Sequence, residues 1–433
     1  MKRLSLLLTT ILIFALAGCG TPGTTEAPTQ APTAAPTWTP RPSPTTAPSA
    51  TPAPTAAPTE LPIATYTAEL SATVVASLPP TPADPSEPSI AGAVALPVRA
   101  SSGPPLWAVF SYGMHSFSTP QKHFVAMYAR LGDTWQQLGK LELENPDYID
   151  PTGVRQVDLA PGYVWLEVQS GVGAHGGCYD LLRFDGKVLQ DVVSHCAESP
   201  GAGGIQDVNG DGTNDVVLDQ TDSYIFCYAC GVRLVKQQVL GWDGQKLAPV
   251  ELTKLPDHAP ASLRDLNDRA SDLAEHGLWK EAQAAVDQMA QLGEHDPTAD
   301  WNAALIRLTA KGRADQAQSG AYPLLDNLFY GDYPAALDVL RQYPPEQLFA
   351  ADTPLVKGTI AEGWEQQVTD SITTTTNLAI QLKPDLAAAY FLRGWGVHLT
   401  DPANPSALAD IERAAQIAPD DKLFTESLAF LKK

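Results

Sequence analysis

Between residues 99 and 256, short runs of apolar and β-branched residues alternate with polar positions and are separated by turn residues. A period of two is typical of strands that bury one face. The expected strands are residues 106–112, 123–131, 163–169, 179–184, 187–194, 215–218, 224–228 and 232–242. The pattern predicts an antiparallel β domain over 99–256, either a sandwich or a propeller-like stack of sheets, because roughly 150 residues are too few for a complete propeller.

The period changes to 3.6 in the last part of the chain, from residue 259 to residue 433. Leu263, Leu266, Ala270 and Leu273 fall on one helix face, as in an amphipathic helix. Similar patterns recur up to a final segment at 423–433, which we expect to form a capping helix. The pattern therefore predicts a helical domain over 259–433.

Two segments of this helical domain combine a glycine, an aromatic residue and small alanines where one helix would turn into the next. They are His276-Gly277-Leu278-Trp279-Lys280-Glu281-Ala282 and Tyr330-Gly331-Asp332-Tyr333-Pro334-Ala335-Ala336-Leu337. Together with the segment from Pro384 to Pro419, they resemble tetratricopeptide (TPR) repeats. The resemblance implies a curved α-solenoid whose groove binds a protein or peptide, with Tyr390, Arg393 and Trp395 of the last repeat as expected contact residues. A solenoid that only packs against the β domain is the alternative.

The first nineteen residues combine a basic start, a short apolar run at 6–16 and the sequence Leu16-Ala17-Gly18-Cys19. This segment resembles the lipobox of bacterial lipoproteins. The resemblance implies that residues 1–18 are a signal peptide and that Cys19 carries a lipid. The chain would then be extracytoplasmic and surface-exposed, anchored in the cell membrane or an outer membrane. The alternatives are an ordinary secretory signal or a transmembrane anchor, but a span needs about 20 apolar residues.

Residues 19–98 are predicted to be a disordered tether, rich in Pro and Thr, between the lipid and the folded domains. Pro recurs at every fourth residue from Pro28 to Pro52. Proline fixes φ near the polyproline II value and donates no hydrogen bond, so neither helix nor sheet is expected. Residues 63–98 are more apolar, and there we expect a linker with at most one short ordered turn.

The chain carries a formal net charge of −21. An acidic protein repels phosphate backbones, so we expect no nucleic-acid partner. Binding to anionic lipid through a basic patch is disfavoured for the same reason. Solubility at a crowded surface is sufficient to explain the charge.

Four cysteines remain once Cys19 is assigned to the lipid: Cys178, Cys196, Cys227 and Cys230. An even number in an oxidising compartment favours disulfides. Cys178 and Cys196 flank a predicted Asp185-Gly186 hairpin turn, which favours a bridge across that hairpin, and Cys227 and Cys230 would then close a tight loop. The alternatives are a redox-active Cys-X-X-Cys pair and a four-cysteine zinc site.

The segment from residue 207 to residue 215, which we call the acid loop, is the most chemically specific part of the chain. Its side-chain oxygens recur at alternate positions, Gly212 permits a sharp turn, and this spacing suits Ca²⁺. The segment resembles the calcium loops of FG-GAP and VCBS repeats. The resemblance implies a structural Ca²⁺ site with Asp207, Asn209, Asp211, Thr213 and Asp215 as ligands. Leu218 replaces the glutamate of an EF-hand, and an acidic turn without metal is the alternative.

No phosphate-binding loop, zinc-protease motif or nucleophile elbow is present in the sequence. His175 and His195 lie near cysteines, where a transition-metal site or ordinary surface histidines are both compatible with the sequence. We therefore expect a non-enzymatic lipoprotein that binds a protein partner or ligand through its helical domain. The alternative is a cell-surface hydrolase or glycan-binding protein that uses the β domain.

Overall fold

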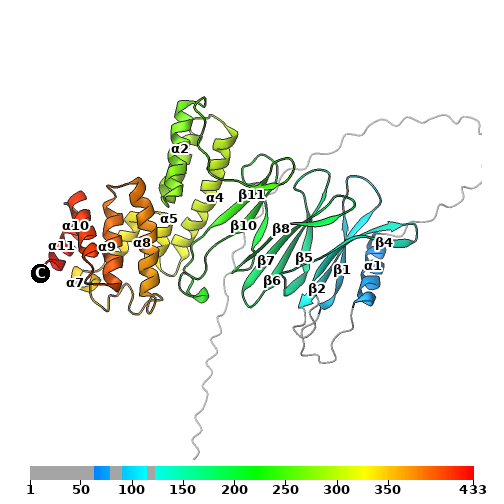
Figure 1. Ribbon diagram of the computed structural model, residues 1–433, viewed down its shortest axis with the longest axis horizontal. Helices are drawn as coiled ribbons and strands as arrows, with labels where there is room; N and C mark the ends of the chain where they lie inside the picture. Colours follow the sequence, from blue (N-terminus) through cyan, green and yellow to red (C-terminus); the bar gives the residue numbers. More distant parts are fainter. Residues whose placement is uncertain (1–62, 79–89, 115–121) are drawn as a thin grey trace, which may run out of the picture. The chain divides into compact units, whose positions relative to one another are not determined.

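The computed structural model of the 433-residue chain describes residues 63–78, 90–114 and 122–433. The predicted signal peptide, Cys19 and the Pro/Thr-rich segment up to residue 62 lie outside the described residues. Within the described part, an antiparallel β region precedes a helical region, as the sequence predicts (Figure 1). No described helix is long and apolar enough to cross a bilayer.

The main sheet of the β region is antiparallel and curled (Figure 1). Its strands are β1 (Ile90–Val98), β2 (Leu106–Met114), β3 (Phe124–Leu131), β4 (Thr134–Glu142), β5 (Tyr148–Val157), β6 (Val164–Val172), β7 (Gly176–Phe184) and β8 (Leu189–Ala197). The strand order is β4-β3-β2-β5-β6-β7-β8, and β1 pairs with β2. The curl brings β4 against β8, and the inner face holds a core that includes Phe110, Met127 and Leu166.

A second, smaller sheet covers the outer face of β6 and β7. It contains β9 (Gly203–Gln206), β10 (Asp215–Asp219), β11 (Gln237–Trp242) and β12 (Leu247–Pro249), in the order β12-β11-β10-β9. Val216 and Leu218 of β10 pack with Trp165 and Tyr179 of the main sheet. Strand alternation explains this arrangement, because even-numbered residues of β6 face the inner core and odd-numbered ones face the second sheet.

Ordered structure begins before residue 99, where the sequence predicts only linker. Helix α1 (Ile63–Ser77) and strand β1 both lie within the predicted tether at 19–98. Leu70 and Val74 of α1 are buried against Trp107 and its neighbours on the main sheet, and the Trp107 indole donates to Thr67. The segment mixes four Ala, which favour a helix, with three Thr and two Val, which are modest helix formers, so packing on the sheet adds to a mixed local propensity.

Seven of the eight predicted strands correspond to observed strands, whereas β1, β4, β5, β9 and β12 were not predicted. Strand β4 is mostly solvent-exposed and polar, and β5 is irregular around Gly153, so neither shows clean alternation. The prediction of a strand at 224–228 is wrong. That segment is a loop that ends in a short 3₁₀ turn (Tyr228–Cys230), because its apolar residues pack on the helical region.

The helical region has one continuous apolar core. Its helices are α2 (Ala261–Glu275), α3 (Trp279–Ala290), α4 (Pro297–Ser319), α5 (Pro323–Tyr330), α6 (Tyr333–Leu340), α7 (Pro345–Leu348), α8 (Glu365–Leu382), α9 (Ala387–Thr400), α10 (Pro405–Ile417) and α11 (Lys422–Leu431). The predicted C-terminal helix is present as α11. The helices are unequal, from four residues in α7 to 23 in α4, and the identity of the region as TPR repeats stays a prediction.

Both predicted turn glycines lie between consecutive helices with left-handed backbones. Gly277 separates α2 from α3 with φ of 75°, and Gly331 separates α5 from α6 with φ of 77°. The two turns contact each other, since a Cβ on Gly331 would stand only 2.7 Å from the Gly277 carbonyl oxygen. Glycine is therefore required at residue 331 both for its backbone angle and for the close approach of the two turns.

The loop between β10 and β11, residues 220–236, leaves the second sheet and packs into the helical core. We call it the docking loop. Phe226 is buried between Tyr322 and Trp364, with ring centroids 5.7 and 6.1 Å away. Val232 is also fully buried in this core. The β and helical regions are therefore joined by an interlocked loop as well as by the chain connection after β12.

Two polar side chains of α4 fix the docking loop. Arg313 donates from Nε to the Val235 carbonyl oxygen at 3.1 Å and from Nη1 to the Phe329 carbonyl oxygen at 2.7 Å. Gln316 donates to the Gly231 carbonyl oxygen at 2.9 Å. Burial lowers the pKa of Arg313 to about 10. Since these donors satisfy backbone oxygens that are partly buried, they hold α4 in place beside the β region.

The stability of the protein is expected to depend on pH, because a carboxyl group is buried next to this junction. Asp326 is fully buried, and its oxygens accept from Gln316 and the Tyr322 backbone N–H, both at 3.0 Å. Burial raises the pKa of Asp326 to about 6, although these hydrogen bonds act in the opposite direction. The folded protein therefore holds the proton more tightly than the unfolded chain, and this stabilisation is lost as pH rises from about 4 through 6.

We expect the free energy of unfolding of the wild type to fall by about 2–3 kcal/mol across this range, relative to Asp326→Asn. Denaturant titrations of both proteins between pH 4 and 7 measure the difference. A difference that does not change with pH would show that the Asp326 pKa is not raised.

Candidate functional site

The acid loop connects β9 to β10 and folds around its own carboxylates. Asp207 accepts from the backbone N–H groups of Gly210 and Gly212, at 2.8 and 3.0 Å. Asp211 accepts from the Thr213 N–H at 2.7 Å. Gly210 and Gly212 both have positive φ, of 77° and 87°, which allows the sharp turns. Glycine and short acidic residues thus build the loop from local hydrogen bonds.

Asp215 is the least accessible carboxylate of the acid loop. It is 3% exposed at the start of β10, and its Oδ2 accepts from the Val208 N–H at 3.1 Å. Burial is the largest cause that raises the pKa of Asp215 to about 6, and the negative charges of Asp211 and Asp207 add to it. The loop therefore concentrates negative charge that its own amides only partly compensate.

The chemistry of the acid loop fits a hard cation, with three carboxylates, the Asn209 amide oxygen and the Thr213 carbonyl as available donors. The carboxylates are directed at backbone amides, however, and no cluster of three His, Cys, Asp or Glu side chains is arranged for a metal within the described part of the chain. Coordination of Ca²⁺ would require these side chains to turn toward a common centre.

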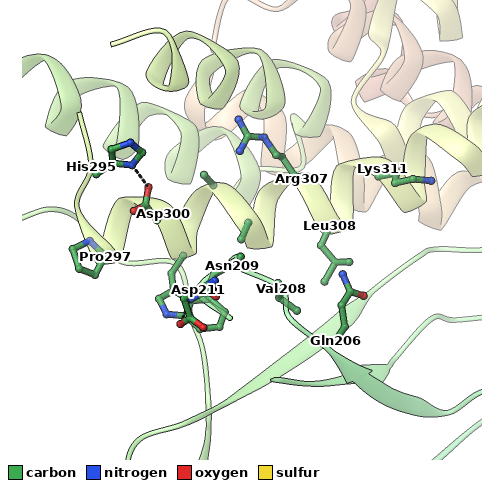
Figure 2. A pocket seen from close by; sticks show the side chains of 14 residues that line it. Gln206, Val208, Asn209, Asp211, His295, Pro297, Asp300, Arg307, Leu308 and Lys311 are labelled. Atoms are coloured by element: carbon green, nitrogen blue, oxygen red, sulfur yellow. Dashed lines mark hydrogen bonds and ion pairs between the residues drawn. The ribbon is translucent and has the colours of Figure 1, made fainter. Parts of the chain in front are cut away.

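A cavity of about 770 Å³ lies between the acid loop and helix α4, and we call it the α4 cavity (Figure 2). Asn209, Asp211 and Val208 line it on the loop side, and Arg307 and Lys311 line it on the helix side. At the start of α4, His295 and Asp300 are 3.5 Å apart. The cavity has carboxylates near one end and cationic side chains near the other.

A second cavity, of about 500 Å³, lies on the other side of the acid loop, and we call it the Trp242 cavity. It shares Asp211, Pro297 and Trp301 with the α4 cavity. Trp242 and Glu251 complete its wall from the β region. The acid loop therefore separates two cavities that are each built from both regions of the protein.

Local structure explains why α4 begins at this point. Asp296 caps the helix by accepting from the backbone N–H groups of Thr298 and Ala299, and Pro297 occupies the first turn. The preceding connection is also fixed, since Asn302 of α4 donates to the Thr253 carbonyl oxygen at 2.6 Å and accepts from the Thr253 N–H at 3.0 Å. These bonds place Trp301 between the two cavities.

Both predicted disulfides are present. Cys178 and Cys196 face each other in register on β7 and β8, and Cys227 is joined to Cys230 across the 3₁₀ turn of the docking loop. A four-cysteine zinc site is therefore excluded in this state. The Cys227–Cys230 pair does not begin an α-helix, so the context of a thioredoxin-like motif is missing.

The two histidines near the cysteines have separate partners. His175 stacks on Tyr228 with ring centroids 4.5 Å apart, and the His195 ring is hydrogen-bonded to the Asp219 carbonyl oxygen at 2.7 Å. Within the described residues, neither histidine belongs to a group of three or more His, Cys, Asp or Glu side chains that could hold a metal ion. Their packing is explained by these contacts.

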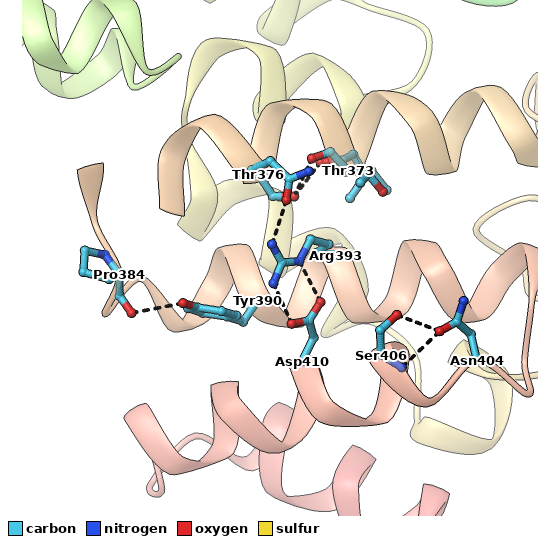
Figure 3. Close-up of polar contacts among 10 residues, drawn as sticks. Thr373, Thr376, Pro384, Tyr390, Arg393, Asn404, Ser406 and Asp410 are labelled. Carbon is cyan, nitrogen blue, oxygen red and sulfur yellow. Dashed lines mark hydrogen bonds and ion pairs between the residues drawn. The ribbon is translucent and has the colours of Figure 1, made fainter. Parts of the chain in front are cut away.

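Two of the residues predicted to contact a protein partner, Tyr390 and Arg393, make polar contacts within the helical region (Figure 3), and the third, Trp395, is buried. Trp395 is 1% exposed and donates from its indole to the Leu348 carbonyl oxygen at 3.0 Å. Arg393 binds both oxygens of Asp410 at 2.7 Å, and the Tyr390 hydroxyl donates to the Pro384 carbonyl oxygen at 3.3 Å. Trp395 is thus a core residue, because it lies on the buried face of α9.

Sequence reasoning selected the acid loop but missed its surroundings. Trp301 and Arg307 lie on α4, and Glu251 lies in the connection after β12. All three are far from the acid loop in sequence. In the sequence they stand out only as a tryptophan on a polar helix and as isolated charged residues. No motif or characteristic spacing connects them to the acid loop. They become part of one site only through the docking of α4.

No known protein family matches this chain, and no curated protein is significantly similar to it in sequence. Function therefore has to be inferred from the site rather than from relatives. The site offers two polar cavities, an acidic loop and no nucleophile–base pair among the residues that line the cavities.

Proposed function

We propose that the protein is a lipid-anchored extracytoplasmic binding protein without catalytic activity, and that its ligand binds where the acid loop faces α4. The observation that carries this proposal is the pair of cavities that flank the acid loop and share Trp301. Binding sites commonly lie between two packed regions, in cavities of this size with a few convergent polar groups. The binding surface would then be the junction between the β and helical regions, where charged and aromatic side chains line the two cavities, and not the last helices.

The proposed location outside the cytoplasm is supported by the two disulfides together with the sequence of the leader. Two disulfides persist in oxidising compartments and are rare in reducing ones. Cys19, preceded by a basic and apolar leader, would supply the lipid anchor.

We expect full-length protein expressed in a bacterial host to sediment with membranes and to carry an added diacylglycerol mass on Cys19. Cys19→Ser removes the thiol that forms the thioether, so this variant should lack the added mass. Membrane fractionation and mass spectrometry measure both. Lipid found on the Cys19→Ser protein would contradict this anchor.

The acid loop is proposed to bind a structural Ca²⁺ through Asp207, Asn209, Asp211, Thr213 and Asp215. Support comes from its donor chemistry and from the concentration of negative charge around the buried Asp215. The bound ion would replace some of the hydrogen bonds to backbone amides and would pin the wall that separates the two cavities.

Millimolar CaCl₂ should raise the melting temperature of the full-length protein by several degrees over EDTA, because an ion that binds only the folded state stabilises it. Asp211→Asn should reduce this shift at least by half. Asp185→Asn is the matched control, since Asp185 also accepts from two turn amides but lies in a different hairpin. An equal shift in all three proteins would rule out the acid loop as the calcium site.

Binding at the junction is tested with Trp301→Leu, which removes the indole shared by both cavities. We expect the wild type to bind at least one of four small probes, n-butylammonium, butyrate, glucose and glycylglycine, in saturation-transfer NMR. Affinity for that probe should fall at least tenfold in Trp301→Leu. Trp135→Leu is the control, because Trp135 is partly exposed near α1. Failure of every probe, or equal binding by Trp301→Leu, would contradict the proposed function.

A further inference from the structure

We propose that the Trp242 cavity binds an ammonium or guanidinium group carried on a short apolar stem. This inference rests on the proposed function, because it names the class of ligand that the junction takes. The argument uses the charge of the cavity wall, the position of one buried carboxylate and the two indoles.

The wall of the Trp242 cavity is acidic. Asp211, Asp215, Asp243 and Glu251 line it, whereas Lys and Arg are absent from its lining. Asp243 is already engaged, since one of its oxygens accepts from the backbone N–H groups of Gln245 and Lys246 at 2.8 Å. Both oxygens of Asp211 also accept hydrogen bonds, from the Thr213 N–H at 2.7 Å and the Asn209 amide at 2.9 Å. Asp215 and Glu251 therefore remain as the carboxylates with the most free acceptor capacity, and an anionic ligand would be repelled.

Asp215 directs an unpartnered oxygen at the space above Gly241. The residue is 3% exposed, and Val208 reaches only its Oδ2. None of the hydrogen bonds found among the described residues reaches Oδ1. A Cβ on Gly241 would stand 3.7 Å from this Oδ1 and 3.7 Å from Cζ2 of Trp301. The missing side chain of Gly241 thus leaves a carboxylate oxygen and an indole facing the same small space.

The two indoles favour a cation with an apolar stem over a hydrated metal ion. Trp301 and Trp242 both line the cavity, and Trp242 is held by edge-on contacts with Trp165 and Tyr163, at 5.7 and 6.2 Å between ring centroids. An aromatic face attracts ammonium and guanidinium groups, whose stems also bury apolar area against it. A volume of about 500 Å³ falls within the range of small-molecule sites and leaves room for such a ligand.

The proposal is tested by titrating full-length protein in detergent micelles with n-butylammonium, butyrate and glucose, monitored by saturation-transfer NMR. The titrations are made in EDTA and repeated in 5 mM CaCl₂, a concentration chosen as roughly saturating for a weak extracellular site. We expect n-butylammonium to bind in both conditions, and butyrate and glucose to bind at least tenfold more weakly.

Two variants locate the binding. Glu251→Gln removes a charge, and Gly241→Ala places a methyl group in the space that Asp215 and Trp301 face, where its nearest neighbour is Val250 at 3.1 Å. Each should weaken n-butylammonium at least fivefold. The matched controls are Glu346→Gln, at an exposed glutamate of α7, and Gly204→Ala, where a Cβ meets nothing within 4 Å. Both controls should bind as the wild type does, and thermal melting confirms that all four variants fold.

The remaining outcomes overturn the inference in distinguishable ways. Binding of glucose or butyrate in place of the amine would leave a binding protein with a different ligand class. Binding of the amine that is unaffected by Glu251→Gln and Gly241→Ala would place the cation elsewhere. Loss of n-butylammonium binding in CaCl₂ would show that Ca²⁺, and not an amine, is the cation that the Trp242 cavity takes. Failure of these three probes would overturn this inference, and failure of glycylglycine as well would overturn the proposed function.

Discussion

The docking of residues 220–236 into the helical core is the constraint on which the rest of the structure depends. Phe226 supplies apolar area to that core, and Arg313 and Gln316 satisfy the backbone oxygens that the loop brings with it. Burying a cation without a carboxylate partner is costly, and here the cost is offset by hydrogen bonds to two carbonyl groups. Without Phe226 the helical core would lose apolar area, and without Arg313 and Gln316 the carbonyl groups of the docking loop would lose their hydrogen-bond donors.

The site is a consequence of this docking and not of the acid loop alone. The loop folds by itself, through hydrogen bonds between its carboxylates and its own amides. Only the placement of α4 opposite to it creates the two cavities and brings Trp301 next to Asp215. The acid loop supplies carboxylates to this site, and α4 supplies Trp301 and the cationic Arg307 and Lys311, so its affinity depends on how rigidly the two regions are joined.

Features that arise from local chemistry were predictable from the sequence, whereas features that arise from tertiary packing were not. The disulfide across the Asp185-Gly186 hairpin followed from turn chemistry, and the turn at Gly331 from its neighbours in sequence. Helix α1 was missed because its stability comes from burial against Trp107. The strand expected at 224–228 was wrong, because an apolar run signals burial without saying in which core. Trp395 was misplaced for a related reason, since a tryptophan on a helix serves packing as readily as recognition.

The interlocked loop also has a consequence for how the chain folds as it is synthesised. Phe226 emerges well before its partners Tyr322 and Trp364, so the β region is complete in sequence while its most apolar loop still lacks a core. Until α4 to α8 follow, that loop is a hydrophobic segment exposed to solvent and to other chains, the kind of surface that chaperones bind. The two regions should consequently reach their native state together and late, and a nascent chain stopped after the β region would be prone to aggregation.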